Sequence, residues 1–371
     1  MKVGIPSEVK NNEFRVAITP AGVHELVRHG HEVYVQQGAG LGSSITDAEY
    51  VAAGGAILPT ADEVWAIADL LLKVKEPIEE EHHRLRKDQT LFTYLHLAAS
   101  RPCTDALIAS GTTAIAYETV ETADRRLPLL APMSEVAGRL APQVGAYHLM
   151  RAAGGRGVLP GGVPGVAAGK AVVIGGGVSG WNATQIAVGM GFHVTLLDRD
   201  INKLKEADKV FGTKVQTVVS NSFELERACL EADLVIGAVL IPGAKAPKLV
   251  TNELVSRMKP GSVLVDIAID QGGCFEDSHP TTHAEPTFQV HNSVFYCVAN
   301  MPGAVPNTST HALTNATLPY ILELADRGWV EALRRDAALA KGLNTHDGKV
   351  VYREVAEAHG LEHTELSALL G

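Results

Sequence analysis

Residues 171–180 read AVVIGGGVSG, in which Gly175, Gly177 and Gly180 follow an aliphatic run with the spacing GxGxxG. The run predicts a buried strand, and the residues beyond the last glycine predict a helix. In this setting the first glycine permits a tight turn, the second lets a pyrophosphate approach the backbone, and the third lets helix and strand pack closely. The stretch therefore predicts the first strand, turn and helix of a dinucleotide-binding Rossmann fold.

Asp198 stands eighteen residues after Gly180 (198 − 180), at the end of the next predicted strand. A carboxylate there can accept hydrogen bonds from both hydroxyls of an adenosine ribose, which favours NAD over NADP. The neighbouring Arg199 could contact a 2′-phosphate, so a minor NADP activity stays open. Other dinucleotide contacts are expected at the helix start and at the carboxyl ends of the strands. These positions are Ser134, Val178, Ser179, Lys203, Ser220, Val239, Leu240, Ile267, Val298, Asn300 and Met301.

Aliphatic runs predict six strands in the same region, most of them separated by helical segments. Residues 129–304 are therefore expected to form a doubly wound parallel sheet. The runs are 171–174, 194–197, 215–219, 234–239, 263–267 and 294–298.

The rest of the chain predicts a second α/β domain. Residues 1–128 alternate short β-rich runs with amphipathic stretches, whereas residues 305–371 are mainly helical and too short for a large core of their own. We therefore expect the last segment to pack on the first. The expected fold class is α/β with two domains, in which the Rossmann domain is inserted into a discontinuous substrate domain.

Two helix starts are marked by local chemistry. Thr19 before Pro20 predicts a helix N-terminus, and Thr60 with Glu63 has the spacing of a capping box. The second helix leads into a predicted strand over 70–75, and a further strand is predicted over 91–95. A long helix is predicted over 132–151, with Pro142 inside it.

Composition excludes several classes of function. Asp and Glu outnumber Lys and Arg by 42 to 32, so the net charge of -10 gives no electrostatic reason to bind nucleic acid or an anionic membrane. The longest aliphatic run, 234–241, is far shorter than the ~20 residues of a membrane helix. The four cysteines form no CxxC pair, and no clustered metal motif such as HExxH occurs. We therefore expect a cytoplasmic protein with reduced thiols and no metal.

The chain resembles the alanine dehydrogenase family along nearly its whole length, and its sequence is most similar to those of the actinobacterial, mycobacterium-like members. The resemblance implies a cytoplasmic, NAD-dependent enzyme that interconverts L-alanine with pyruvate and ammonia, as a homohexamer of two-domain subunits. The stretches that carry it include GIPSEVKNNEFRVAITPAGV (4–23), LLLKVKEP (70–77), TYLHLAAS (93–100), APMSEVAGRLAPQVGAYHL (131–149), VDIAIDQGGCFE (265–276) and CVANMPGAVPNTSTHALTNATLPY (297–320).

The same resemblance assigns four site residues. It implies that Arg15 and Lys75 bind the substrate, that His96 donates a proton, and that Asp270 is catalytic, orienting water and ammonia. The residues alone leave alternatives open. Arg15 could be a surface arginine, and Lys73 shares the strand face of Lys75. His96 is one of fifteen histidines, and Asp270 could simply cap a turn.

Three other functions remain open on the sequence. One is a related dehydrogenase acting on glyoxylate and glycine or on another 2-oxo acid. A second is an NAD(H)-binding subunit like that of proton-translocating transhydrogenase, which shares the fold and part of the N-terminal sequence. The third is an NAD sensor without catalysis.

Overall fold

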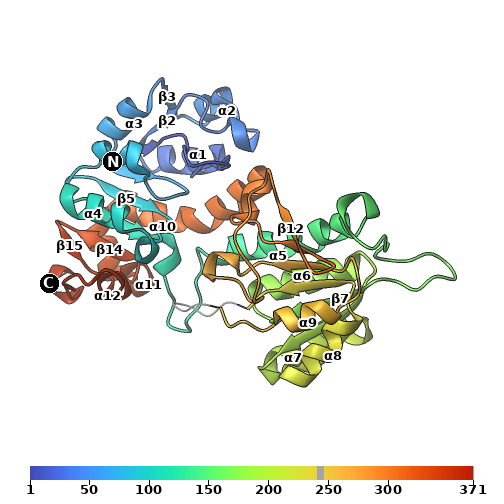
Figure 1. Ribbon diagram of the computed structural model, residues 1–371. Coiled ribbons are helices and arrows are strands. Elements are labelled where there is room, and N and C mark those ends of the chain that lie inside the picture. Colours follow the sequence, from blue (N-terminus) through green and yellow to red (C-terminus); the bar gives the residue numbers. More distant parts are fainter. Residues whose placement is uncertain (240–245, 371) are drawn as a thin grey trace. The chain divides into compact units, whose positions relative to one another are not determined.

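The structure is a computed structural model that describes residues 1–239 and 246–370. The chain divides into two compact units, which are described separately (Figure 1). Unit 1 combines Met1–Met133 with Val305–Gly371, and unit 2 is Ser134–Ala304. The predicted α/β fold class is confirmed, because each unit is built on a mainly parallel sheet.

The sheet of unit 1 has eight strands in the order β15-β14-β6-β5-β4-β1-β2-β3. Strands β1 to β6 pair parallel, and β14 and β15 extend the sheet antiparallel beyond β6. The C-terminal segment, expected to be mainly helical, therefore also supplies two strands. The bounds are β1 Lys2–Ile5, β2 Glu32–Gln36, β3 Ala56–Leu58, β4 Leu70–Leu72, β5 Thr90–Thr93, β6 Thr113–Ala116, β14 Leu343–His346 and β15 Lys349–Val350.

Two helices of unit 1, α1 and α3, begin where the sequence predicts. The Thr19 side chain accepts from the N–H of Gly22 at the start of α1, and Thr60 and Glu63 form the predicted capping box of α3. The bounds are α1 Pro20–Arg28, α2 Asp47–Ala52, α3 Ala61–Ile67, α4 Arg101–Ser110, α10 Pro306–Arg335, α11 Ala337–Ala340, α12 Arg353–His359 and α13 Ser367–Leu370.

The sheet of unit 2 has seven strands in the order β12-β13-β11-β10-β7-β8-β9. The six predicted strands are all present and parallel, and the order reverses between β7 and β10, as in a doubly wound Rossmann sheet. The short edge strand β12, antiparallel to β13, was not predicted. The bounds are β7 Lys170–Ile174, β8 His193–Asp198, β9 Val215–Val219, β10 Leu234–Gly237, β11 Val263–Asp266, β12 Thr287–Val290 and β13 Ser293–Tyr296.

In the described part of the chain five helices belong with this sheet, and the first of them, α5, begins just before the division between the units. It spans Ala131–His148, so the predicted long helix ends three residues early but does contain Pro142. The others are α6 Val178–Gly189, α7 Ile201–Phe211, α8 Ser222–Glu231 and α9 Asn252–Arg257.

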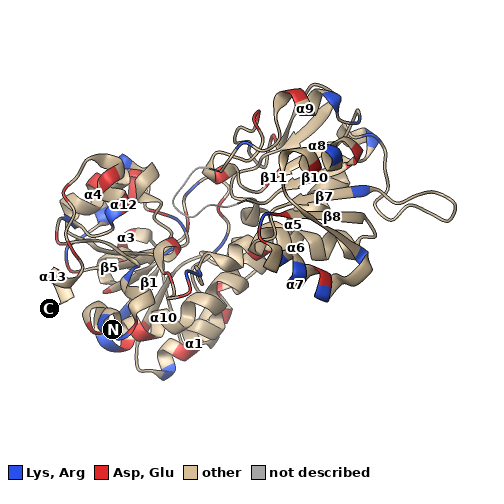
Figure 2. Ribbon diagram, turned by 90° about the horizontal axis from the view of Figure 1, so that it is seen from below, with Lys and Arg blue, Asp and Glu red and all other residues tan. Residues whose placement is uncertain are grey.

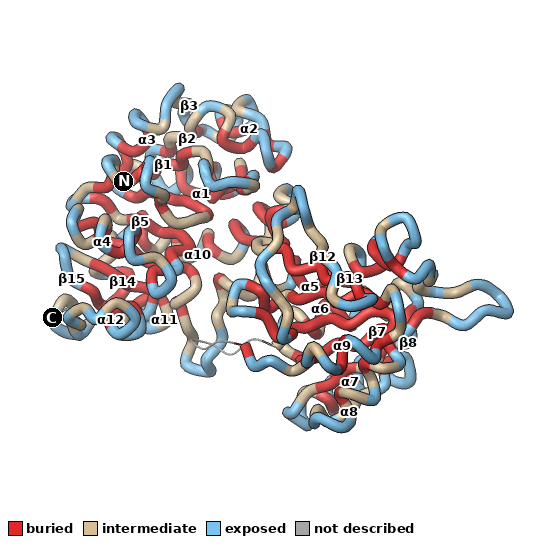
Figure 3. The backbone as a smooth tube through the Cα atoms, in the orientation of Figure 1, coloured by how far each residue is buried: buried red, intermediate tan, exposed pale blue. Residues whose placement is uncertain are grey.

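Buried residues are concentrated in the strands of each sheet, and exposed residues in the outer loops and helices (Figure 3). Strand β4 is buried at all three positions, and β10 and β11 at all four. Basic and acidic residues are interspersed in both units (Figure 2). Among residues 1–239 and 246–370, no helix is long and apolar enough to cross a membrane.

Candidate active site

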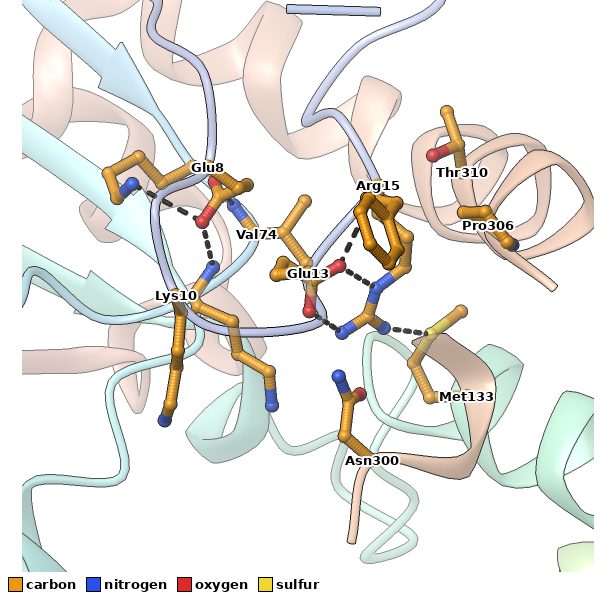
Figure 4. A network of polar contacts seen from close by, with 12 residues as sticks. Glu8, Lys10, Glu13, Arg15, Val74, Met133, Asn300, Pro306 and Thr310 are labelled. Carbon is orange, nitrogen blue, oxygen red and sulfur yellow. Dashed lines mark hydrogen bonds and ion pairs between the residues drawn. The ribbon is translucent and has the colours of Figure 1, made fainter. Parts of the chain in front are cut away.

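Arg15 is a buried residue, which excludes the surface alternative. Only 2% of it is exposed, and its guanidinium forms a two-pronged ion pair with Glu13 (Figure 4). Nε donates to Glu13 Oε1 at 2.7 Å and Nη2 donates to Oε2 at 2.6 Å, while Nη1 lies 2.9 Å from Met133 Sδ. Burial disfavours the Glu13 carboxylate, but the hydrogen bonds and charge of Arg15 outweigh it and lower the pKa of Glu13.

The structure separates the two lysines that strand periodicity left equivalent. Strand β4 ends at Leu72, so both follow the strand rather than lying in it. Lys73 is fully buried, and its Nζ lies 3.2 Å from Glu8 Oε2 and 3.0 Å from Glu81 Oε1. Lys75 is partly exposed. Two buried carboxylates therefore hold Lys73, which acts as a structural cation.

Glu8 also shapes the backbone at Lys75. Its Oε1 accepts from the N–H of Val74 at 2.7 Å, and its Oε2 from the N–H of Lys75 at 3.3 Å. These bonds satisfy amides that would otherwise be paired in a longer strand, which explains why β4 stops short of the predicted residue 75. One buried carboxylate thus fixes both the structural lysine and the segment that carries Lys75.

His96 lies in a left-handed backbone conformation just after β5, which ends at Thr93 rather than at residue 95. Its φ and ψ are 48° and 37°, which are rare for a residue with a Cβ. Glu118 holds this turn by accepting from the N–H of His96 at 2.6 Å and of Leu95 at 3.2 Å. The imidazole is exposed and stacks on Tyr94, with ring centroids 5.9 Å apart.

Glu13 and Tyr94 connect the three candidate residues of unit 1. The charge of Lys75 acts on Glu13, and the charge of Arg15 acts on Tyr94, the ring on which His96 stacks. Unit 1 thus brings Arg15, Lys75 and His96 into one region. A guanidinium and an ammonium there suit the carboxylate of a ligand. The imidazole can exchange a proton with another group of the same ligand.

The glycine turn of unit 2 has the geometry of a dinucleotide site. Gly175 has a φ of 102°, and a Cβ on Gly180 would lie only 1.7 Å from the carbonyl oxygen of Gly175. Gly177 caps α6, so the first turn at Val178 and Ser179 offers its amides to an anion. A Cβ on Gly177 would meet nothing within 4 Å, which leaves the approach to these amides open.

Asp198 ends β8 beside this turn and supports it. Its Oδ2 accepts from the N–H of Gly176 at 2.6 Å, and its Oδ1 accepts from the N–H of Asp200 at 2.8 Å. Lys203 Nζ lies 3.5 Å from the same Oδ2. Asp198 and Lys203 therefore lie where the adenosine half of a dinucleotide is expected.

The remaining predicted cofactor positions belong to the same end of the sheet or to α5. Ser220, Val239 and Ile267 directly follow or closely follow β9, β10 and β11. Val298, Asn300 and Met301 lie beyond β13, and Ser134 lies in the first turn of α5. Leu240 lies outside the described residues.

Asp270 belongs to unit 2, in a 3₁₀ turn (Ile269–Gln271) that follows β11. Its side chain is exposed. The candidate residues of unit 1 and Asp270 therefore come from different units. The acidic partners Glu8, Glu13 and Glu118 were not predicted; the first two lie in the quoted stretch 4–23, which is the signal that could have pointed to them.

Two protein-family models together match most of the chain. The model "Alanine dehydrogenase/PNT, N-terminal domain" matches residues 4–137, and "Alanine dehydrogenase/PNT, C-terminal domain" matches residues 141–353. The chain belongs to the alanine dehydrogenase/PNT family. The resemblance drawn from the sequence is thereby confirmed.

Curated members of this family align over all or nearly all of the chain. Identity is 68% over 370 residues with alanine dehydrogenase of Mycolicibacterium smegmatis and 67% with that of Mycobacterium tuberculosis, covering 100% of both chains in each case. Identity with the Bacillus subtilis alanine dehydrogenase is 54%, covering 98% of this chain and 96% of the relative.

Solved structures rank the two branches of the alanine dehydrogenase/PNT family in the same way. An L-alanine dehydrogenase superposes with a TM-score of 0.95 at 51% identity, covering 97% of this chain and 99% of that one. A transhydrogenase from Sinorhizobium meliloti gives 0.84 at 27% identity, covering 95% and 100%. The chain is thus more similar to the alanine dehydrogenases than to this transhydrogenase.

Proposed function

We propose that the chain catalyses the NAD-dependent, reversible oxidative deamination of L-alanine to pyruvate and ammonia. The observation that carries this proposal is the 68% identity to an alanine dehydrogenase over 100% of both chains. Conservation at this level over both units favours a shared substrate and cofactor over the transhydrogenase-like or NAD-sensing alternatives.

In this proposal unit 1 is the substrate domain and unit 2 is the NAD domain. The glycine turn fits the cofactor, because no Cβ could fit between Gly180 and Gly175, and the space at Gly177 leaves the amides at the start of α6 open to a pyrophosphate. Asp198 at the end of β8 suits the two ribose hydroxyls of NAD. Bound NAD would supply the acceptor for the hydride that leaves C2 of alanine.

Arg15 and Lys75 hold the substrate carboxylate. Glu13 accepts from Nε and Nη2 of Arg15 and so fixes the orientation of the guanidinium, whose Nη1 lies near Met133 Sδ. Arg15 and Lys75 both act on Glu13, and a guanidinium and an ammonium in one region suit a carboxylate.

His96 exchanges a proton with the C2 heteroatom, a role for which an imidazole is suited. Asp270 aligns the water that adds to the iminium carbon and accepts its proton. Collapse of the resulting carbinolamine, in which His96 delivers a proton to nitrogen and the hydroxyl proton passes to solvent as the carbonyl forms, releases ammonia and pyruvate. Amination of pyruvate uses the same groups in reverse.

The test of substrate class is NADH formation by the purified chain with L-alanine, D-alanine, glycine, serine and 2-hydroxypropionate. We expect the highest kcat/KM with L-alanine. Activity confined to 2-hydroxypropionate would overturn the reaction class, and NAD binding without any turnover would favour the sensor. A preference for glycine would favour the glyoxylate alternative.

The test of residue roles uses His96→Ala and Asp270→Asn, with His193→Ala as a control on an exposed histidine at the amino end of β8. We expect kcat to fall about 100- to 10,000-fold in the first two and to stay unchanged in the control. Near-normal turnover in folded, NAD-binding His96→Ala and Asp270→Asn proteins would refute the assignment.

The proposal also includes a cytoplasmic homohexamer, as the family resemblance implies. The cytoplasmic location is supported by the four cysteines, which are all free and buried, as suits a reducing compartment. Light scattering after size exclusion tests the assembly, with six times the 39.3 kDa chain mass as the expected result.

A further inference from the structure

Asp266, the last residue of β11, is a fully buried carboxylate that the sequence did not single out. Oδ1 accepts from the N–H of Ala268 at 3.1 Å and lies 3.5 Å from Cys274 Sγ. Oδ2 accepts from the N–H of Cys274 at 2.9 Å, the N–H of Phe275 at 3.3 Å and the hydroxyl of Ser278 at 2.5 Å. The carboxylate therefore collects donors from two separate segments.

These donors lie on both sides of Asp270. Ala268 precedes the 3₁₀ turn that carries Asp270, whereas the Oδ2 donors belong to the segment 274–278 that follows it. Gly273 completes the loop with a φ of 74°, and a Cβ there would lie 2.7 Å from Asp266 Oδ2. The backbone after Asp270 thus packs directly on the carboxylate, and one side chain ties the loop at both ends.

Burial raises the pKa of Asp266 while the hydrogen bonds oppose that rise. A fully buried carboxylate is costly unless such bonds are made, so its retention here calls for a reason beyond packing.

We propose that Asp266 is a positioning residue, which fixes the loop so that the carboxylate of Asp270 is held ready for catalysis. The proposal rests on the proposed function, because it assigns Asp266 an effect only through Asp270. It predicts a loss of turnover without a loss of NAD binding when the tie is weakened.

The decisive variant is Asp266→Asn. Its amide oxygen can keep the three donors at the Oδ2 position, while its NH2 group then faces the N–H of Ala268 and cannot accept from it. The ties lost are those at the Oδ1 position, from the N–H of Ala268 just before Asp270 and from the thiol of Cys274. We expect kcat to fall about 10- to 100-fold, as a misplacement of about 1 Å can cause, with the Kd of NADH unchanged.

The matched control is Asp233→Asn. Asp233 is also a buried carboxylate, placed before β10 at the other end of the sheet, where it accepts from the N–H of Lys170 at 2.8 Å and pairs with Lys259 at 3.2 Å. We expect this variant to lower the unfolding midpoint and to leave kcat unchanged. Equal losses of kcat in the two variants would show a merely structural role and overturn the proposal.

A double variant separates positioning from general damage. When Asp270 is already Asn, adding Asp266→Asn is expected to lower kcat no further. Losses that multiply instead would overturn the proposal, as would parental kcat in Asp266→Asn. Parental kcat in Asp270→Asn alone would refute the proposed function first and remove the basis of this inference.

Ser278→Ala provides a milder change for the case in which Asp266→Asn does not fold. It removes one neutral donor from Oδ2 and leaves the carboxylate in place. We expect kcat to fall about two- to fivefold, again with no further fall in the Asp270→Asn background. An unchanged kcat in this variant would then decide against the proposal.

Discussion

Lys73 and Lys75 stand two residues apart, and their replacement by methionine is expected to damage different properties. Lys73 is 1% exposed in its side chain, and its partners Glu8 and Glu81 are 2% and 3% exposed. Lys73→Met keeps the apolar stem but leaves two buried carboxylates without their cation. Removing one partner of a buried ion pair costs about 3–5 kcal/mol, so we expect a free energy of unfolding lower by that amount.

The pH dependence adds a second signature. Burial already raises the pKa of Glu8, and without Lys73 that pKa rises further. A carboxyl group whose pKa is raised in the folded state contributes stability below its unfolded pKa and loses it as pH rises through the folded value. The destabilisation by Lys73→Met should therefore be larger at neutral pH than at mildly acidic pH.

Lys75→Met should leave stability nearly unchanged, because Lys75 is partly exposed. In the proposed function it removes a charged contact to the substrate carboxylate, which is worth about 1.5–3 kcal/mol, or about a 10- to 150-fold loss of kcat/KM for L-alanine. Chemical denaturation and initial-rate kinetics on both variants make the comparison. The reasoning is refuted if Lys73→Met unfolds like the parent but loses catalysis, while Lys75→Met keeps its catalytic efficiency.

Three further outcomes are expected. Glu13→Gln should make the free energy of unfolding less dependent on pH in the acidic range. The pKa of Glu13 is lowered in the folded state, so this carboxylate contributes stability above its unfolded pKa and loses it as pH falls. Denaturation at a series of pH values checks this. Gly180→Ala should abolish NADH binding measured by fluorescence, since its Cβ would clash with Gly175, whereas Gly189→Ala on the same helix meets nothing within 4 Å and should bind normally. Native protein should give almost no reaction with a thiol reagent at neutral pH, and four thiols should react after denaturation. The reason is that burial raises the pKa of every cysteine, to about 12 for Cys103, Cys229 and Cys297 and well above the usual value for Cys274.

The Rossmann sheet was predictable because its parallel strands are buried on both faces and read as aliphatic runs. Strand β10, for example, is buried at all four positions. Strands β12 (TFQV) and β14 (LNTH) were missed because they are short and partly polar, and they exist through pairing with β13 and β6. Long-range pairing of this kind leaves no periodic pattern in four residues.

The candidate site was only partly predictable. Arg15, Lys75, His96 and Asp270 came from family resemblance, since arginine, lysine, histidine and aspartate are common on any surface. Their partners depend on contacts that local sequence does not encode. Glu118, which holds the turn at His96, lies 22 residues away, and Glu8 lies 65 residues from Lys73.

The pairing of β14 with β6 has a consequence for the order in which the chain folds. Strand β6 can pair with β14 only after the last part of the chain has been synthesised. Residues 134–304, in contrast, form one continuous stretch that is complete earlier. We expect unit 2 to become protected first in pulse-labelled hydrogen exchange during refolding, and the edge of β6 to be among the last sites to gain protection. Until then this edge is open to pairing with another unfinished chain, which makes slow synthesis or truncation of the last strands a route to aggregation.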